Sequence, residues 1–142
     1  MNIKDVMTES PACCTADVGL QDVAKMMVDH DCGCIPVVDD TESKMPIGMI
    51  TDRDITCRVV AQGQNPLDLT AGDAMTASVV SISPEMSLEE CLNLMEDSQI
   101  RRIAVVDGSG CICGIVSQAD VATKTDSAKT AEVVQQVSRV SA

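Results

Sequence analysis

Two short segments of the chain place a hydroxyl and a carboxylate at the same spacing. One reads GMITDRD and the other GIVSQAD, so each has Gly, two apolar residues, Thr or Ser, two variable residues and Asp, here called the glycine–aspartate motif. The matched polar residues are Thr51 with Asp54, and Ser117 with Asp120. A carboxylate accepts hydrogen bonds from two adjacent hydroxyls, and helix-start N–H groups favour phosphate. The spacing therefore suits a ligand with adjacent hydroxyls or a phosphate.

The same residues also fit purely structural roles. Thr or Ser just before a helix is a common N-cap, so Thr51 and Ser117 could serve only to close a first turn. Asp in that turn gains under about 1 kcal/mol from the helix dipole. Asp52 with Asp54 has the spacing of a metal-binding pair, but these side chains diverge at a helix start and no third ligand is near in sequence. We expect no metal site, and the structural and ligand-binding interpretations both remain open.

The residue pairs that covalent or acid–base catalysis requires are not evident in the chain. His30 is the only histidine, and it falls near the end of an expected helix. The spacing of hydroxyl and carboxylate matches a clamp on sugar hydroxyls better than acid–base chemistry. We therefore expect no catalytic residues and no enzymatic activity.

Composition restricts what the molecule can bind. The chain has 142 residues, no Phe, Tyr or Trp, and a net charge of −12. A flat ring such as a nucleobase would have to lie between aliphatic side chains, and the negative charge argues against a nucleic-acid polymer as partner. No apolar run reaches the roughly 18 residues of a membrane span, and the N-terminus has no signal-peptide pattern. The sequence predicts a cytoplasmic protein without a membrane or nucleic-acid partner.

The eight cysteines admit two interpretations. None forms the C-x-x-C spacing of a zinc or thioredoxin-like site, and without a secretory signal we expect no disulfide framework. Most are therefore expected to be small buried apolar residues. The alternative is a redox or metal sensor, for which the two Cys-x-Cys pairs, Cys32 with Cys34 and Cys111 with Cys113, would have to lie close together in space. The cysteines are Cys13, Cys14, Cys32, Cys34, Cys57, Cys91, Cys111 and Cys113.

The chain contains an internal repeat. VMT recurs as AMT and IPVVD recurs as IAVVD, each 68 residues later, while the glycine–aspartate motif recurs 66 residues later. A shorter turn in the second copy explains the difference. The predicted division is a first motif at 1–62, a linker at 63–73, a second motif at 74–124 and a C-terminal amphipathic helix at 125–142.

Each copy predicts the order β-α-β-β-α. The first helix of each copy has apolar residues at i, i+3, i+4 and i+7, which lie on one face, and Ser87 with Glu90 forms a capping-box pattern. One copy is too small to bury its apolar faces alone. We therefore predict a mixed α/β (α+β) fold in which two motifs pack sheet to sheet as a pseudo-two-fold pair. The helix positions are Leu20, Val23, Ala24 and Met27, and Leu88, Cys91, Leu92 and Met95.

These repeated motifs resemble a pair of CBS domains, an arrangement called a Bateman module. The resemblance rests on the Met-Thr openings, the IPVVD and IAVVD strands and the two glycine–aspartate motifs, and it covers about residues 1–124. The chain is most similar to small stand-alone bacterial and archaeal CBS proteins. The resemblance implies a homodimer that binds AMP, ADP, ATP or S-adenosylmethionine in clefts between the two motifs, with no further cofactor required.

The resemblance also implies which residues contact the ligand. Each half-site would be completed by a loop of the other motif, which carries Arg101 and Arg102 in the second copy but Gly33 and Cys34 in the first. Because guanidinium groups bind phosphate, we predict one phosphate-binding cleft and one that takes a less charged ligand or stays empty. Ala104 stands where proline is common in the family. The expected ligand-binding residues are Thr51, Asp54, Arg101, Arg102 and Ala104 in the first cleft, and Ser117, Asp120, Ile35, Pro36 and Val37 in the second.

The sequence thus favours a non-catalytic regulatory or sensor module. It would respond to an adenine nucleotide and signal by conformational change to an unidentified protein target, which requires that the ligand bind one of two states more tightly. Two alternatives stay open: a cysteine-based redox or metal sensor, and a ligand-free interaction domain.

Overall fold

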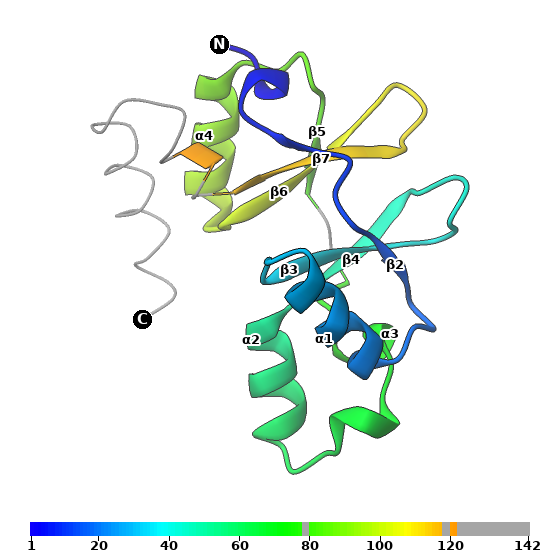
Figure 1. The fold of residues 1–142 in the computed structure, drawn as a ribbon. Helices are drawn as coiled ribbons and strands as arrows, with labels where there is room; N and C mark the ends of the chain where they lie inside the picture. Colours follow the sequence, from blue (N-terminus) through cyan, green and yellow to red (C-terminus); the bar gives the residue numbers. More distant parts are fainter. Residues whose placement is uncertain (78–79, 118–119, 122–142) are drawn as a thin grey trace. The chain divides into compact units, whose positions relative to one another are not determined.

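The computed structural model describes residues 1–77, 80–117 and 120–121 (Figure 1). The amphipathic helix predicted at 125–142 lies outside these residues. Short strands alternate with helices along the described chain and form two separate sheets. The mixed α+β fold class predicted from the repeat is confirmed.

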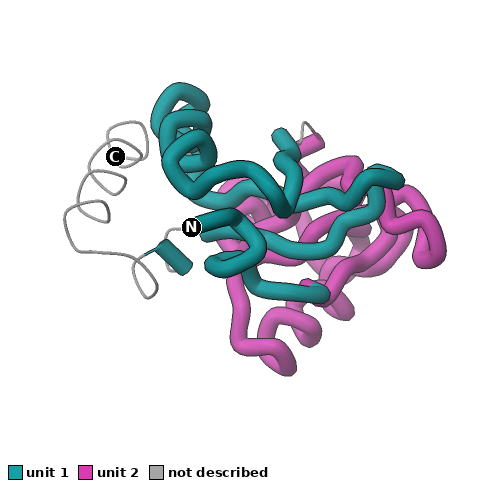
Figure 2. The backbone as a smooth tube through the Cα atoms, turned by 90° about the horizontal axis from the view of Figure 1, so that it is seen from above, with its two compact units in different colours: residues 1–10, 80–142 teal, residues 11–79 magenta. Residues whose placement is uncertain are grey.

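The chain divides into two compact units that do not follow the order of the sequence (Figure 2). Unit 1 contains residues 1–10 and the residues from Val80 onward, while unit 2 contains residues 11–79. Each sequence repeat is one continuous segment. Unit 1 instead joins residues 1–10, from the first repeat, to residues of the second repeat. The segment after the first motif belongs to unit 2, because Ala71 and Ala74 are buried in the core of that unit.

Unit 2 has a three-stranded sheet in the order β2-β3-β4, with β2 parallel to β3 and β3 antiparallel to β4. Leu20, Val23 and Val59 from its helices share one core with Ile35 and Ile50 from the sheet. Its elements are β2 (Cys14–Thr15), α1 (Leu20–Asp29), β3 (Cys34–Val38), β4 (Pro46–Thr51), α2 (Asp52–Asp54), the π-helix η2 (Ile55–Val60), the 3-10 helix η3 (Pro66–Asp68) and α3 (Ala71–Ala74).

Unit 1 repeats this plan and adds one strand from the N-terminus. The order is β1-β7-β6-β5, with β5 parallel to β6 and the other neighbours antiparallel. Asp120 and Val121 are helical, as the repeat predicts. The elements are the 3-10 helix η1 (Ile3–Asp5), β1 (Thr8–Glu9), β5 (Ser81–Ile82), α4 (Leu88–Ser98), β6 (Arg102–Val106) and β7 (Ile112–Ser117).

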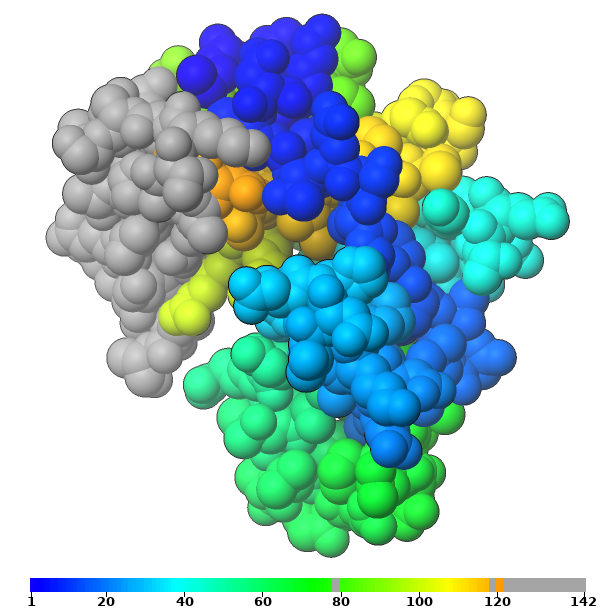
Figure 3. Space-filling model, in the orientation of Figure 1, coloured from blue at the N-terminus to red at the C-terminus, as the bar shows by residue number. Residues whose placement is uncertain are grey.

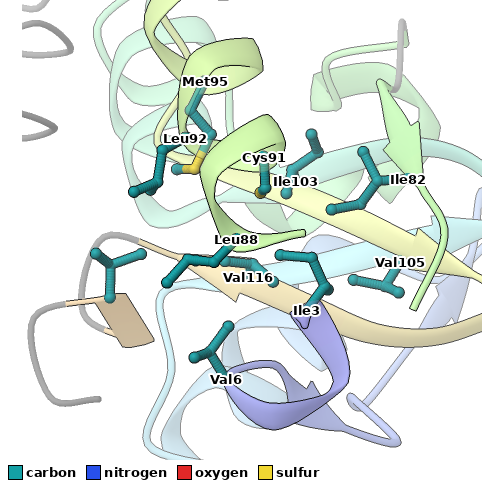
Figure 4. Packing of buried hydrophobic residues seen from close by; sticks show 11 residues of the cluster. Ile3, Val6, Ile82, Leu88, Cys91, Leu92, Met95, Ile103, Val105 and Val116 are labelled. Atoms are coloured by element: carbon teal, nitrogen blue, oxygen red, sulfur yellow. The ribbon is translucent and has the colours of Figure 1, made fainter. Parts of the chain in front are cut away.

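The apolar stripe predicted for α4 is confirmed. Its four apolar positions are all buried (Figure 4), and Glu90 N–H donates to Ser87 Oγ at 3.2 Å at the helix start. The stripe predicted for α1 is wrong at one position, since Ala24 is exposed. The buried side of α1 instead runs from Leu20 and Val23 to the half-buried Met26 and Met27. The α4 residues are Leu88, Cys91, Leu92 and Met95.

The two Met-Thr segments are exchanged between the repeat copies. In unit 1, β1 pairs antiparallel with β7, which places Thr8 opposite Ile115. In unit 2, Thr76 bridges Met49 of β4, with N–H···O distances of 2.8 and 3.0 Å. We call residues 7–10 and 75–77 the first and second crossing segments. Each one lies on the hairpin of the other copy, and Figure 3 shows the N-terminal residues as a dark blue strip on the surface.

The glycines of the glycine–aspartate motifs make room for these crossings. A Cβ on Gly48 would lie 2.7 Å from both Met75 Sδ and the Thr76 carbonyl oxygen. A Cβ on Gly114 would lie 2.5 Å from Met7 Sδ. Both distances are too short for a real side chain. The Met-Thr motif of one copy therefore packs against the glycine of the glycine–aspartate motif of the other copy.

Candidate functional site

Thr51 and Asp54 bind each other where β4 runs into α2. Asp54 N–H donates to Thr51 Oγ1 at 3.0 Å, and Thr51 N–H donates to Asp54 Oδ2 at 3.0 Å. This reciprocal pair is a capping box, which satisfies two backbone donors that the helix start leaves unpaired. The N-cap role considered for Thr51 is confirmed. It also fixes the position of the Asp54 carboxylate.

Ser117 and Asp120 repeat this geometry at the end of β7. Ser117 N–H donates to Asp120 Oδ2 at 2.9 Å, and Asp120 N–H donates to Ser117 Oγ at 3.2 Å. We call the two pairs the carboxylate caps. In both caps the Asp is half-buried, and its Oδ2 atom accepts from the backbone of the preceding strand end.

The other oxygen of each carboxylate, Oδ1, contacts a residue outside the cap. Asp54 Oδ1 lies 3.6 Å from Arg58 Nε, and their side chains are 15% and 54% exposed, respectively. Asp120 Oδ1 accepts a hydrogen bond from Thr8 Oγ1 at 3.2 Å. Arg58 also donates from Nη1 to the Met75 carbonyl oxygen at 3.1 Å. Both caps are therefore linked to the crossing segment of their unit.

Sequence reasoning missed both of these partners. Arg58 could have been found, because Asp54 and Arg58 have the i, i+4 spacing of helical ion pairs. Thr8 could not, because 112 residues separate it from Asp120 and no local pattern joins them.

The two hairpins carry different residues beside the caps. Cys34 is the register partner of Thr51 across β3 and β4, and Arg102 is the register partner of Ser117 across β6 and β7. Arg102 is half-buried, whereas the adjacent Arg101 is exposed. The arginine that the sequence assigned to the Thr51 half-site thus has Ser117 as its neighbour within its own unit.

The remaining predicted residues lie in the middle strands of the sheets. Ile35 and Val37 are fully buried in the unit 2 core, so only their backbone could reach a ligand. Pro36 is buried and is the register partner of Met49, and Ala104 is also buried. Pro36 and Ala104 alternate with the core residues along their strands, so they lie on the opposite face of the sheet.

Gln99 has a backbone conformation that no sequence pattern predicts. It ends α4 in the left-handed region at φ 54°, and Asp31, the matched residue of the first copy, also has φ 49°. The repeated conformation is a helix ending rather than a mark of function. Gln99 Nε2 donates to the Glu96 carbonyl oxygen at 3.0 Å, and its buried Oε1 has no partner among the described residues.

All eight cysteines are free thiols, and the expectation that most would be buried is wrong. Only Cys14 and Cys91 are buried, while Cys57 is exposed and the others are half-buried. Burial raises the pKa of Cys91 to about 11, and burial together with Cys13 and Asp17 raises the pKa of Cys14 to about 11. These two thiols therefore remain neutral at physiological pH.

The described residues lack two kinds of feature. Within the ranges given above, no three His, Cys, Asp or Glu side chains are grouped so that they could hold a metal ion. In that same part of the chain, no helix combines the length and apolar character needed to cross a bilayer.

The repeat, the sheets and the carboxylate caps together define a known family. The model of the CBS domain family matches residues 3–60 and again residues 71–125. The chain therefore belongs to the CBS domain family and carries two CBS domains in tandem, as the motifs of the sequence predict.

Relatives in this family include proteins of similar and of greater length. The CBS domain-containing protein YhcV of Bacillus subtilis is 38% identical over 130 residues, which cover 92% of this chain and 89% of that protein. An uncharacterized protein of Methanopyrus kandleri is 36% identical over 118 residues, which cover 83% of this chain. This match spans only 57% of the length of the Methanopyrus protein.

Solved structures share the fold. Hypoxic Response Protein I, solved with two coordinated zinc ions, is 32% identical with a TM-score of 0.76, and covers 89% of this chain and 100% of its own. The CBS domain pair of protein MJ0100, in complex with methylthioadenosine and S-adenosylmethionine, has a TM-score of 0.75 at 24% identity, over 87% of this chain and 94% of its own. CBSX2 in complex with AMP has a TM-score of 0.71 at 22% identity, over 86% and 93%.

Proposed function

We propose that this protein is a non-catalytic regulatory module that binds an adenosine-type ligand at its carboxylate caps. The observation that carries the proposal is the repeated geometry of Asp54 and Asp120. In each cap the backbone holds Oδ2, and Oδ1 is in contact with a donor from another part of the unit. A ribose presents two adjacent hydroxyl donors, and a carboxylate fixed in this way is suited to accept from them.

Ligands of proteins with the same fold support this choice. The MJ0100 pair binds methylthioadenosine and S-adenosylmethionine, and CBSX2 binds AMP. Those likenesses establish the fold of this chain, while the ligand class rests on its own caps. Because the chain has no aromatic residue, the adenine would lie between aliphatic side chains. AMP, ADP, ATP and S-adenosylmethionine are the candidates.

Arg101 and Arg102 are the residues that we propose to bind the phosphate. Both precede or begin β6, and Gly33 and Cys34 occupy the matched positions in the first copy. In this proposal the arginines complete the Thr51 and Asp54 half-site, in a cleft that also includes Ala104. The half-site of Ser117 and Asp120, with Ile35, Pro36 and Val37, then takes a ligand with less negative charge or none.

The strand register favours a second assignment of the arginine, because Arg102 lies opposite Ser117 in its own hairpin. A double-mutant cycle separates the two. AMP affinity is measured by calorimetry for Arg102→Ala, Asp54→Asn, Asp120→Asn and the two doubles. If Arg102 and Asp54 bind one AMP molecule, their effects are non-additive by about 0.5–3 kcal/mol. Coupling with Asp120 instead would contradict our assignment and place the phosphate at Ser117.

A thermal-shift screen tests the ligand class itself. The ligands are AMP, ADP, ATP, S-adenosylmethionine, methylthioadenosine and NAD, and any that binds only the folded state must raise the melting temperature. We expect at least one to do so, and the double variant Asp54→Asn, Asp120→Asn to lose that shift. No shift with any of them would contradict the proposal and favour a ligand-free interaction domain.

Binding would be converted into a signal by a change in conformation. We propose that the chain acts as a cytoplasmic homodimer and that the liganded state contacts a protein target differently from the free state. This requires the ligand to bind one state more tightly, since equal affinity shifts nothing.

A metal or redox sensor is the second candidate, favoured by the zinc ions of Hypoxic Response Protein I. The contact in this chain that is relevant to a metal or redox sensor joins Cys34 Sγ and Met49 Sδ, which lie 3.8 Å apart. Metal analysis of the purified protein, with thiol counts under reducing and oxidising conditions, tests this candidate. A stoichiometric metal ion or a reversible change in thiol count would favour it over the nucleotide sensor.

A further inference from the structure

We propose that the crossing segments report whether the carboxylate caps are occupied. A ribose hydroxyl that binds Asp120 Oδ1 displaces Thr8, and one that binds Asp54 Oδ1 displaces Arg58. The ligand then loosens the crossing segment held at that cap. This inference rests on the proposed function, because the ribose is that of the adenosine-type ligand.

The distances show which oxygen can be exchanged. The backbone donors reach Oδ2 of Asp54 and Asp120 at 3.0 and 2.9 Å, which is the ordinary length of such a bond. Thr8 Oγ1 reaches Asp120 Oδ1 at 3.2 Å, which is long between two oxygens, and Arg58 Nε stands 3.6 Å from Asp54 Oδ1, beyond hydrogen-bond range. In both caps Oδ2 has the shorter of these contacts and Oδ1 the longer one, so we expect a ribose hydroxyl to compete at Oδ1.

The weak partners are both attached to the crossing segments. Thr8 belongs to the first segment and contacts Asp120 directly. Arg58 stands between Asp54 and the second segment, since its Nη1 donates to the Met75 carbonyl oxygen at 3.1 Å. The two copies thus make the same connection with different chemistry, a hydroxyl in one and a guanidinium in the other. Because a different residue type makes this connection in each copy, the connection does not depend on one particular side chain.

The crossing segments are short, and each packs a methionine, Met7 or Met75, against the core of its unit. Strand β1 has two residues, and the second segment pairs through a single bridge at Thr76. Thr8, Glu9 and Ser10 are exposed. Loss of one hydrogen bond, worth about 0.5–1.5 kcal/mol, would weaken the backbone pairing of such a short segment.

Their place in the chain makes this loosening useful for signalling. The boundaries between the compact units fall between Ser10 and Pro11 and again between Val79 and Val80. The first crossing segment ends at the first boundary, and the second crossing segment ends two residues before the second boundary. A ligand that frees a crossing segment thereby changes the constraint on the chain at that boundary. Thr8 and Arg58 are positioning residues in this scheme, since they act on the carboxylate and not on the ligand.

The experiment combines AMP affinity with amide exchange in the crossing segments. Ser10 N–H donates to the Cys113 carbonyl oxygen at 3.1 Å and reports on the first segment; Thr76 N–H donates to the Met49 carbonyl oxygen at 2.8 Å and reports on the second. Calorimetry gives the affinity for AMP, and exchange of these two amides is followed by NMR. In the unsubstituted chain we expect saturating AMP to speed the exchange of the amide beside the occupied cap severalfold.

Thr8→Val and Arg58→Met remove the competing groups and keep much of their side-chain volume. In the variant at the occupied cap, the reporting amide should exchange fast without AMP, and AMP should cause no further change in its exchange. AMP should also bind about 2- to 10-fold more tightly, which is the equivalent of one net hydrogen bond. Thr76→Val is the matched control, because it replaces Thr by Val in the second crossing segment. In this variant the Ser10 amide should exchange as in the unsubstituted chain.

The outcomes separate the inference from the proposed function. AMP that binds while both amides exchange as before would overturn the inference alone, and so would an amide response that persists in Thr8→Val and Arg58→Met. Failure of AMP and of every other adenosine ligand to bind the unsubstituted chain would overturn the proposed function, and the inference with it.

Discussion

Asp54 and Asp120 each divide two tasks between their carboxylate oxygens. Oδ2 closes the capping box and is needed for the helix start, whereas Oδ1 is turned to Arg58 or Thr8. A capping residue alone would need only the first of these oxygens. The structural and ligand-binding interpretations of the caps are therefore compatible, because they use different atoms of the same side chain.

The cysteines allow a prediction at the same scale. Iodoacetamide at pH 8 should modify Cys57 first, because it is exposed, and should leave Cys14 and Cys91 unmodified. Only the thiolate reacts, and the pKa of these two buried thiols is raised to about 11. Peptide mass spectrometry of the alkylated protein checks the order. Urea before alkylation is the control, since it should make all three sites react, and early modification of Cys91 in the folded chain would contradict the assignment.

Between secondary-structure elements, the decisive contact is the crossing of a Met-Thr segment over a glycine. The two crossings are alike in position but differ in which atom a new Cβ would meet. At Gly48 that atom is the backbone carbonyl oxygen of Thr76 at 2.7 Å, besides Met75 Sδ, whereas at Gly114 it is the flexible end of Met7, with the Thr8 carbonyl oxygen at 3.2 Å. A side chain can move aside more easily than a paired backbone.

Alanine at the two glycines should therefore have unequal effects. Gly48→Ala is expected to lower the free energy of unfolding by about 1–3 kcal/mol, the usual cost of overpacking, and Gly114→Ala by less. Gly108→Ala is the control, because nothing lies within 4 Å of its added Cβ. Urea denaturation measures all three variants. Equal stability of Gly48→Ala and the unsubstituted chain would show that the second crossing segment does not press on β4.

The elements that could be predicted from sequence are those set by local patterns. The helix caps follow from the Thr or Ser and the Asp three residues later, and the α4 stripe follows from the spacing of Leu88 and Met95. The exchange of crossing segments could not be predicted, because both begin with Met-Thr and either would fit either hairpin. Thr8 as a partner of Asp120 was hidden for the same reason, since it depends on which hairpin the first segment joins.

The whole chain is a repeat whose copies each contribute a segment to the other. Ile3 and Val6, from the first residues of the chain, are fully buried in the same core as Leu88 and Ile103 of the second copy (Figure 4). Cutting the chain between its two sequence repeats would therefore leave the unit 1 core without two of its buried side chains. The core of unit 1 thus draws on both repeats, and the tandem pair is the unit that we propose to sense the ligand.

Binding of the ribose by the cap carboxylates can be tested with 2′-deoxy-AMP. This analogue keeps the adenine and the phosphate of AMP and lacks one of the two adjacent hydroxyls that a cap carboxylate would accept. Since a hydrogen bond to a charged group is worth about 1.5–3 kcal/mol, we expect calorimetry to show at least about tenfold weaker binding of 2′-deoxy-AMP than of AMP. Equal affinity for the two nucleotides would contradict binding of the ribose by these carboxylates.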